Sequence, residues 1–168
     1  MRSRITIALL SMLLIACLSM TSPALSRAEA YEALKGVDAV KVVFDFRNAK
    51  PEAVLDYLTL IQLTYKDEAV TRISPKPDFV VAFMGPSVKL LSTNREGFSP
   101  EEQKTLDKIA GLILQMGKDG VRFEICLFAV KHFGLEPQAV IPGIEHVQNG
   151  WISSFGYQAR GYGLIPVF

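Results

Sequence analysis

Cys126 is the residue of this sequence with the clearest chemical potential, because it lies between two segments of different periodicity. Residues 121–125 are expected to form a strand, and residues 127–133 a short helix. A thiol at the start of a helix faces unpaired N–H groups and the positive end of the helix dipole. These favour the thiolate, which is the nucleophilic form. A small buried hydrophobic side chain is the other common fate of a free cysteine, and both interpretations stay open at this point.

Further candidate residues follow two other apolar segments. Asp45 and Arg47 end the first, and Gly85 and Ser87 follow the second. In an open parallel sheet, ligands bind beyond the carboxyl ends of the strands. We therefore expect these positions to lie near Cys126 and interpret Asp45, Gly85 and Ser87 as pocket residues, although a turn aspartate is also common for structural reasons.

The two histidines of the domain are weaker candidates. His146 lies in an irregular segment near the expected site and is interpreted as a further pocket residue, with a surface or packing role as the alternative. His132 follows Cys126 by six residues, about 600° around an ideal helix, so it is expected to point elsewhere. Two histidines without a cysteine pair give no zinc spacing, and residues 85–87 lack the full phosphate-loop pattern. We expect no metal and no organic cofactor.

The N-terminus has the features of an export signal. Arg2 and Arg4 precede an apolar run over residues 5–18, and Ala28-Glu29-Ala30 matches a cleavage site. The run is short for a membrane span, which needs roughly 20 residues. The sequence therefore predicts a signal peptide over residues 1–30, cleavage near Ala30 and a periplasmic or exported domain over residues 31–168.

A second interpretation of this region rests on Cys17. The residues Leu14-Ile15-Ala16-Cys17 resemble a lipobox, so the alternative is a lipoprotein anchored to a membrane at Cys17. In either case Cys126 is the only cysteine of the remaining domain, which excludes an internal disulfide there. A lone thiol in an oxidising compartment is buried and inert, paired between chains, or used chemically.

Composition bounds the class of protein. The 168 residues suit one domain, and 49% hydrophobic with 21% charged residues fits a globular chain. The formal net charge of +1 gives no basic surface, so we expect no nucleic-acid partner.

The apolar patterns predict alternating strands and helices. Near-continuous apolar runs indicate buried strands over residues 39–46, 78–84, 121–125 and 162–168, with a short strand within residues 139–147. Helical spacing indicates helices from Pro51 to about Val70, from Pro100 to a C-cap at Gly117, over residues 127–133, and over residues 151–160. In the last helix, Trp151, Phe155 and Ala159 are expected to face inward. This alternation predicts an α/β fold: three layers, α/β/α, with a mostly parallel sheet of about five strands.

Four segments of the chain resemble the DsrE/DsrF-like (TusD-like) sulfur-relay family. They are the stretch Gly120-Val121-Arg122-Phe123-Glu124-Ile125-Cys126-Leu127-Phe128-Ala129-Val130-Lys131-His132-Phe133-Gly134, the first strand ending in Asp45, the strand end Phe83-Met84-Gly85, and Gln158-Ala159-Arg160-Gly161-Tyr162 before the last strand. The resemblance covers roughly residues 38–168. Well-known members are cytoplasmic, whereas this chain begins with an export signal.

The resemblance implies that Cys126 accepts a sulfane sulfur as a persulfide and passes it to a partner thiol, as a sulfurtransferase-like carrier. It also implies a homo-oligomer, a trimer or a hexamer, that exchanges sulfur with a donor or acceptor protein or with a small sulfane compound. The alternatives are a non-catalytic oligomer that binds a ligand or a partner, and a redox-sensing thiol protein. A membrane would be involved only if Cys17 is lipidated.

Overall fold

The computed structural model describes residues 31–168, so the predicted signal over residues 1–30 lies outside the described residues. Five parallel strands form one sheet in the order β4-β3-β2-β1-β5. Their bounds are β1 Lys41–Phe46, β2 Asp78–Phe83, β3 Arg122–Cys126, β4 Glu145–Val147 and β5 Gly163–Val167. The predicted α/β class, the five strands and the parallel sheet are confirmed.

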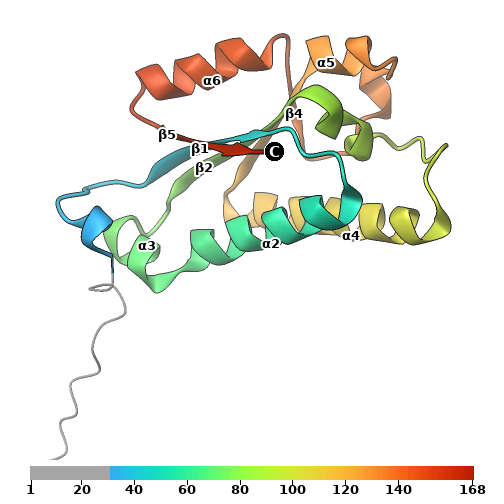
Figure 1. Cartoon of the computed structure of the whole chain (residues 1–168). Helices are drawn as coiled ribbons and strands as arrows, with labels where there is room; N and C mark the ends of the chain where they lie inside the picture. The colour runs from blue at the N-terminus through green and yellow to red at the C-terminus, as the bar shows by residue number, and fades with distance from the viewer. Residues whose placement is uncertain (1–30) are drawn as a thin grey trace, which may run out of the picture.

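Helices cover both faces of the sheet (Figure 1). The α-helices are α2 Pro51–Lys66, α3 Glu68–Ile73, α4 Pro100–Asp119, α5 Leu127–His132 and α6 Gly150–Ala159, and the 3-10 helices are η2 Glu32–Leu34, η3 Gly85–Leu91 and η4 Pro137–Ala139. The helices α2, α3 and α4 lie on one face, whereas α5 and α6 lie on the other. The core is built from both faces of the central strands, whose buried rings include Phe46, Phe79, Phe83 and Phe123.

The chain changes face between β2 and β3. After β2 it continues through η3 to α4, but after β3 it enters α5 on the opposite face (Figure 1). Such a reversal leaves a crevice beyond the carboxyl ends of the two strands, because neither connection covers it. Cys126 ends β3 at this place.

Two predicted helix ends differ from the structure. The first long helix ends at Lys66, because the Asp67 side chain accepts a hydrogen bond from the Ala69 N–H and thereby caps the separate helix α3. The helix α4 passes the predicted C-cap Gly117 and ends at Asp119, and its C-cap is Gly120, whose φ of 111° is costly for other residues. Its start agrees with the sequence, since Ser99 and Glu102 form a capping box.

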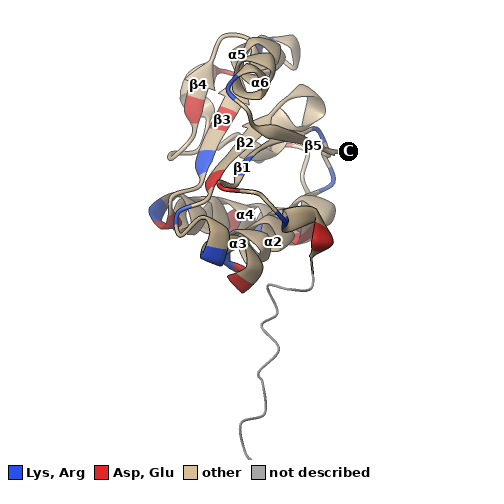
Figure 2. Cartoon of the chain, turned by 90° about the vertical axis from the view of Figure 1, so that its left-hand side faces the viewer, with Lys and Arg blue, Asp and Glu red and all other residues tan. Residues whose placement is uncertain are grey.

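The two helical layers differ in charge. Lys, Arg, Asp and Glu gather on α2, α3 and α4, whereas the layer of α5 and α6 is mostly uncharged (Figure 2). The helix α6 contains no charged residue and exposes Trp151, Ile152 and Phe155. Within residues 31–168, no helix is long and apolar enough to cross a membrane.

The prediction that Trp151, Phe155 and Ala159 face inward is wrong. Trp151 is 67% exposed and Phe155 60% exposed, and Ala159 is exposed as well. The buried residues of α6 are Gly150, Ser154 and Tyr157. Glu124 of β3 determines which side of α6 faces the sheet. Its side chain is only 4% exposed and accepts hydrogen bonds from the hydroxyls of Ser153 and Tyr157. A buried carboxylate needs such donors, so the polar side of the helix turns inward.

A second part of this polar network lies at the amino ends of β2 and β3. Arg122 donates to Asp78 at 2.6 Å, to the Tyr162 hydroxyl at 3.0 Å and to the Tyr157 hydroxyl at 3.1 Å. Burial alone would raise the pKa of Asp78, but the hydrogen bonds from Tyr162 and Arg122 outweigh it, so this pKa lies below its ordinary value. The network fastens α6 and the start of β5 to the sheet.

Candidate functional site

Cys126 is the last residue of β3 and the N-cap of α5. The residue is 6% exposed. Its sulfur accepts a hydrogen bond from the Gly150 N–H, with an N···S distance of 3.2 Å. Gly150 is the first residue of α6, so an unpaired donor at a helix N-terminus points at the sulfur. A hydrogen bond of this kind stabilises a thiolate more than a thiol.

The helix that reaches the sulfur differs from the one that the sequence indicates. The expected partner is the helix after β3, but α5 gives the Cys126 side chain no capping hydrogen bond. The donor instead belongs to α6, which begins 24 residues further along the chain. Because α6 crosses the sheet from β4 at one edge to β5 at the other, its first turn lies over the end of β3.

Gly150 makes this approach possible because it has no side chain. A Cβ at this position would lie 2.5 Å from the Met84 sulfur, 2.7 Å from Met84 Cγ and 3.1 Å from Cys126 Cβ. Contacts under 3.0 Å force one side to move. The glycine is therefore required by the close packing of α6 against β2 and β3, not by an unusual backbone conformation.

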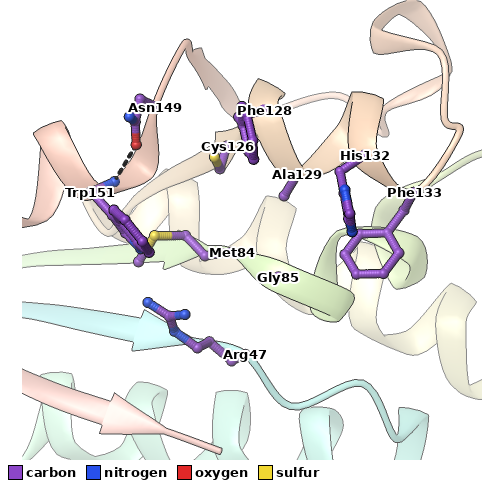
Figure 3. Close-up of a pocket in the computed structure, with 10 residues that line it drawn as sticks. All are labelled: Arg47, Met84, Gly85, Cys126, Phe128, Ala129, His132, Phe133, Asn149 and Trp151. Atoms are coloured by element: carbon purple, nitrogen blue, oxygen red, sulfur yellow. Dashed lines mark hydrogen bonds between the residues drawn. The ribbon is translucent and has the colours of Figure 1, made fainter.

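Cys126 lies in the wall of a cavity of about 380 Å³. The cavity occupies the crevice beyond β2 and β3, below the start of α6 (Figure 3). Ten residues line it, and they come from the ends of β1, β2 and β3, from the starts of η3 and α6, and from both ends of α5: Arg47, Met84, Gly85, Cys126, Phe128, Ala129, His132, Phe133, Asn149 and Trp151. Its volume is within the range of small-molecule sites, and most of its wall is aromatic or aliphatic.

Arg47 supplies the fixed charge of this cavity. Its Nε donates to Asp45 Oδ1 at 2.8 Å and its Nη2 donates to Asp45 Oδ2 at 2.9 Å. These hydrogen bonds, together with the charges of Asp45 and Cys126, raise the pKa of Arg47 above its ordinary value against the opposing effect of burial. Figure 3 shows the guanidinium directed toward Met84 and Trp151 from the end of β1.

The predicted pocket residues do not all line the cavity. Gly85 lines the cavity with Cys126, and Asp45 lies behind Arg47 and orients it. Ser87 is fully buried, and its hydroxyl donates to the carbonyl oxygens of Phe46 and Met84 at 2.8 and 2.9 Å, so it joins β1 to the turn after β2. His146 is exposed on the edge strand β4 and does not line the cavity.

Seven of the ten residues of the cavity wall are not among the candidates that the sequence indicates, and three of the seven, His132, Trp151 and Phe128, are aromatic residues with a clear reason. His132 was expected to point elsewhere, but it lines the cavity, stacked on Phe128 with ring centroids 6.5 Å apart. The predicted angle of about 600° between Cys126 and His132 assumed that Cys126 is helical. Cys126 is instead extended, with ψ of 109°, and the helix begins at the next residue. Trp151 lines the cavity instead of packing in the core, and Phe128 does so from the first turn of α5. The exposure of Trp151 depends on which side of α6 faces the sheet.

The cavity has the parts for thiol chemistry on an anionic compound: a nucleophile, a hydrogen-bond donor to that nucleophile, and a cation. Within residues 31–168, no cluster of three or more His, Cys, Asp or Glu side chains could hold a metal ion.

Three solved structures are similar to this chain. The protein of unknown function MTH1491 from Methanobacterium thermoautotrophicum is 20% identical over 76% of this chain and 98% of its own length, with a TM-score of 0.57. The conserved protein of unknown function BT1422 from Bacteroides thetaiotaomicron is 18% identical over 76% of this chain and 94% of its own, with a TM-score of 0.54. The ychN protein from E. coli is 16% identical over 77% and 99%, with a TM-score of 0.50. At these identities the likeness shows a shared fold.

No protein-family model matches the sequence, and no curated protein matches it in sequence.

Proposed function

We propose that this chain is a sulfur carrier, similar to the DsrE/DsrF-like relay proteins, in which Cys126 holds a sulfane sulfur as a persulfide. The observation that carries the proposal is the position of the sulfur atom. It lies in the wall of a cavity large enough for a small molecule, and it accepts a hydrogen bond from the first N–H of α6. An inert core cysteine needs neither a cavity nor a donor.

The reaction needs no external oxidant. After losing its proton to water, the Cys126 thiolate attacks the outer sulfur of a donor such as thiosulfate. A sulfur–sulfur bond forms to Cys126, the bond between the two donor sulfurs breaks, and its electron pair leaves with sulfite. In the second step an acceptor thiolate attacks the terminal sulfur of the persulfide. The new persulfide then belongs to the acceptor, and the Cys126 thiolate returns.

Arg47 supports this reaction as a positioning residue. Thiosulfate and the thiosulfonate salts are anions, and a thiolate repels them. The guanidinium offsets that repulsion, and its bidentate contact with Asp45 fixes its direction. The two N–H groups of Arg47 Nη1 bond to none of residues 31–168, so they remain for a ligand.

Intact mass spectrometry tests the proposal. The chain from Tyr31 onward contains only Cys126, so any added sulfur has one possible thiol. After incubation with thiosulfate or polysulfide and removal of the excess, the protein should gain the mass of one sulfur atom, and a thiol reductant should remove it. Cys126→Ser should gain nothing. An unchanged mass of the folded wild-type chain would exclude the carrier function, and a covalent dimer would identify a redox-sensing thiol instead.

The second candidate is a module that binds an organic ligand without transferring sulfur. Two observations favour it: Cys126 is only 6% exposed, and the cavity wall is largely aromatic. Under this function a ligand would bind equally well to the wild-type chain and to Cys126→Ser, and neither would gain mass.

We further propose that the domain is exported and self-associates. Exposed apolar side chains on α2, on the edge strand β5 and just after it support an interface between copies, since large apolar patches mark interaction sites. They include Leu60, Leu63, Ile165 and Phe168. Light scattering of the purified domain should report a trimer or a hexamer, and a monomer would contradict this.

The mass of the native N-terminus distinguishes cleavage after Ala30 from lipidation at Cys17, and a retained Met1 would contradict both.

A further inference from the structure

The cavity beside Cys126 is much larger than an inorganic sulfur anion needs. Its volume is about 380 Å³, whereas a cavity of about 150 Å³ holds a benzene molecule. A water molecule occupies about 30 Å³ of the liquid, and thiosulfate is only a few times larger. Thiosulfate in contact with the sulfur would leave most of the cavity wall without a partner.

The wall is chemically suited to an aromatic ring. Phe128, Phe133 and Trp151 contribute rings, and Met84 contributes a polarizable thioether. Phe128 and Trp151 line the cavity but are 71% and 67% exposed. A ring bound between them would therefore remove apolar surface from water. Rings pair edge-to-face or offset with such partners, and a methionine sulfur packs well at a ring edge.

The charge of the wall selects an anion. Arg47 is the permanent cation, His132 is the second basic side chain, and none of the ten lining residues is acidic. Asp45 engages Nε and Nη2 from behind, so Nη1 is the part of the guanidinium left for a ligand. The cavity therefore combines an apolar body with one anion-binding end.

We propose that the cavity binds aromatic organic anions and that, as a sulfur donor, this protein uses an aryl thiosulfonate-type compound in preference to inorganic thiosulfate. The ring lies among Phe128, Trp151 and Met84, and the sulfonyl oxygens face Arg47. The binding claim rests on the cavity alone, whereas the donor claim rests on the proposed function.

The transfer step with such a donor balances. The Cys126 thiolate attacks the terminal sulfur of benzenethiosulfonate, and a sulfur–sulfur bond forms. The bond between that sulfur and the sulfonyl sulfur breaks, and its electron pair leaves as benzenesulfinate. Two negative charges enter and two remain, one on the persulfide and one on the sulfinate.

Benzenesulfonate tests binding separately from transfer because it has no transferable sulfur. Trp151 is the only tryptophan of the chain and lines the cavity, so its fluorescence reports occupancy. In the Cys126→Ser protein, benzenesulfonate should bind at least about tenfold more tightly than methanesulfonate, because burying a ring gains well over 1.4 kcal/mol. Equal affinities for the two sulfonates would overturn the binding claim.

Variants locate the bound ligand. Phe128→Ser and Arg47→Gln should each weaken benzenesulfonate binding by about tenfold, and Arg47→Lys should restore part of the loss. Phe155→Ser is the matched control, since Phe155 is an exposed ring on α6 that does not line the cavity. Binding that survives both cavity variants would place the ligand elsewhere and overturn the proposal.

The rates of sulfur gain separate the two proposals. Benzenethiosulfonate should load the wild-type chain at least about tenfold faster than methanethiosulfonate at equal concentration, because both donors expel a sulfinate and differ in the ring. If both donors load at the same rate and no sulfonate preference exists, the carrier function stands and the aromatic selectivity fails. If benzenesulfonate binds as expected but neither donor adds sulfur, the carrier function fails and the aromatic anion site stands.

Discussion

Gly150→Ala is expected to lower the free energy of unfolding by about 1–3 kcal/mol, the usual cost of overpacking. The added methyl would lie 2.5 Å from the Met84 sulfur and 3.1 Å from Cys126 Cβ. The Met84 side chain can move only into the cavity that it lines, whereas Cys126 Cβ is fixed at the end of a central strand. Relief of these contacts therefore narrows the cavity, or shifts the helix outward and lengthens the N–H···S hydrogen bond, and either change should slow the loading of sulfur. Urea unfolding and the rate of mass gain measure both effects.

Gly156→Ala is the matched control, because the same substitution in the same helix meets nothing within 4 Å. It should raise the free energy of unfolding by about 0.5–1 kcal/mol, the usual gain from replacing a helical glycine. Combining Gly150→Ala with Met84→Ala should lower the free energy of unfolding by about 1 kcal/mol less than the sum of the single effects, because the shorter side chain at position 84 leaves room for the added methyl. Additive costs, or a stable Gly150→Ala with unchanged loading, would contradict the packing described for α6.

Tyr157→Phe is expected to lower the free energy of unfolding at neutral pH by about 1–3 kcal/mol, because it removes a donor from the buried Glu124 carboxylate. Burial, the hydrogen bond to Glu124 and the charge of Glu124 raise the pKa of Tyr157 to about 12, despite the opposing charge of Arg122. An unfolded tyrosine titrates near 10. The neutral phenol therefore stabilises the fold below pH about 10, and this contribution is lost as the pH rises toward 12.

The alkaline loss of stability should accordingly be smaller in Tyr157→Phe than in the wild-type chain, although Tyr162, whose pKa is also raised, keeps part of it. Tyr57→Phe is the control, since Tyr57 is 38% exposed, and its unfolding free energy should change by less than about 0.5 kcal/mol. Chemical denaturation at neutral pH and between pH about 9 and 11 measures the two slopes. Equal alkaline slopes in Tyr157→Phe and the wild type would show that this phenol is not held neutral by the fold.

The sheet and its order along the chain were predictable because the strands carry their own signal. Residues such as Val43, Val80 and Ile125 occur in apolar runs that only a doubly covered strand can bury. The alternation with amphipathic helices then leaves a parallel sheet as the consistent arrangement. The capping box at Ser99 likewise fixes a helix start by local chemistry alone.

The orientation of α6 could not be predicted from its own sequence. Its large aromatic side chains Trp151 and Phe155 indicate one buried face, but Glu124 on β3 requires hydroxyl donors and so selects the opposite one. This preference depends on a contact between residues about 30 positions apart. The orientation of α6 has one signal in the sequence. An acidic residue interrupts the apolar run of a strand, and a later helix carries a Ser and a Tyr on the same side.

The position of Cys126 at a strand end was predictable, but its surroundings were not. The sequence places Gly85 and Asp45 at neighbouring strand ends, and the structure keeps Gly85 in the cavity wall with Asp45 behind Arg47. Ser87 became a buried structural hydroxyl and His146 an exposed residue, because the path of the chain after each strand decides which side chains turn toward the crevice.

The rate at which Cys126 of the folded chain reacts with iodoacetamide, measured in urea below the unfolding transition, tests most directly whether the sulfur atom is reachable through its cavity. We expect a rate that hardly changes with urea across the native baseline, because the reagent reaches the sulfur without unfolding. A rate that rises with urea as steeply as the unfolding equilibrium itself would mean that the thiol reacts only after the domain opens, and the proposed sulfur chemistry would then have no native site.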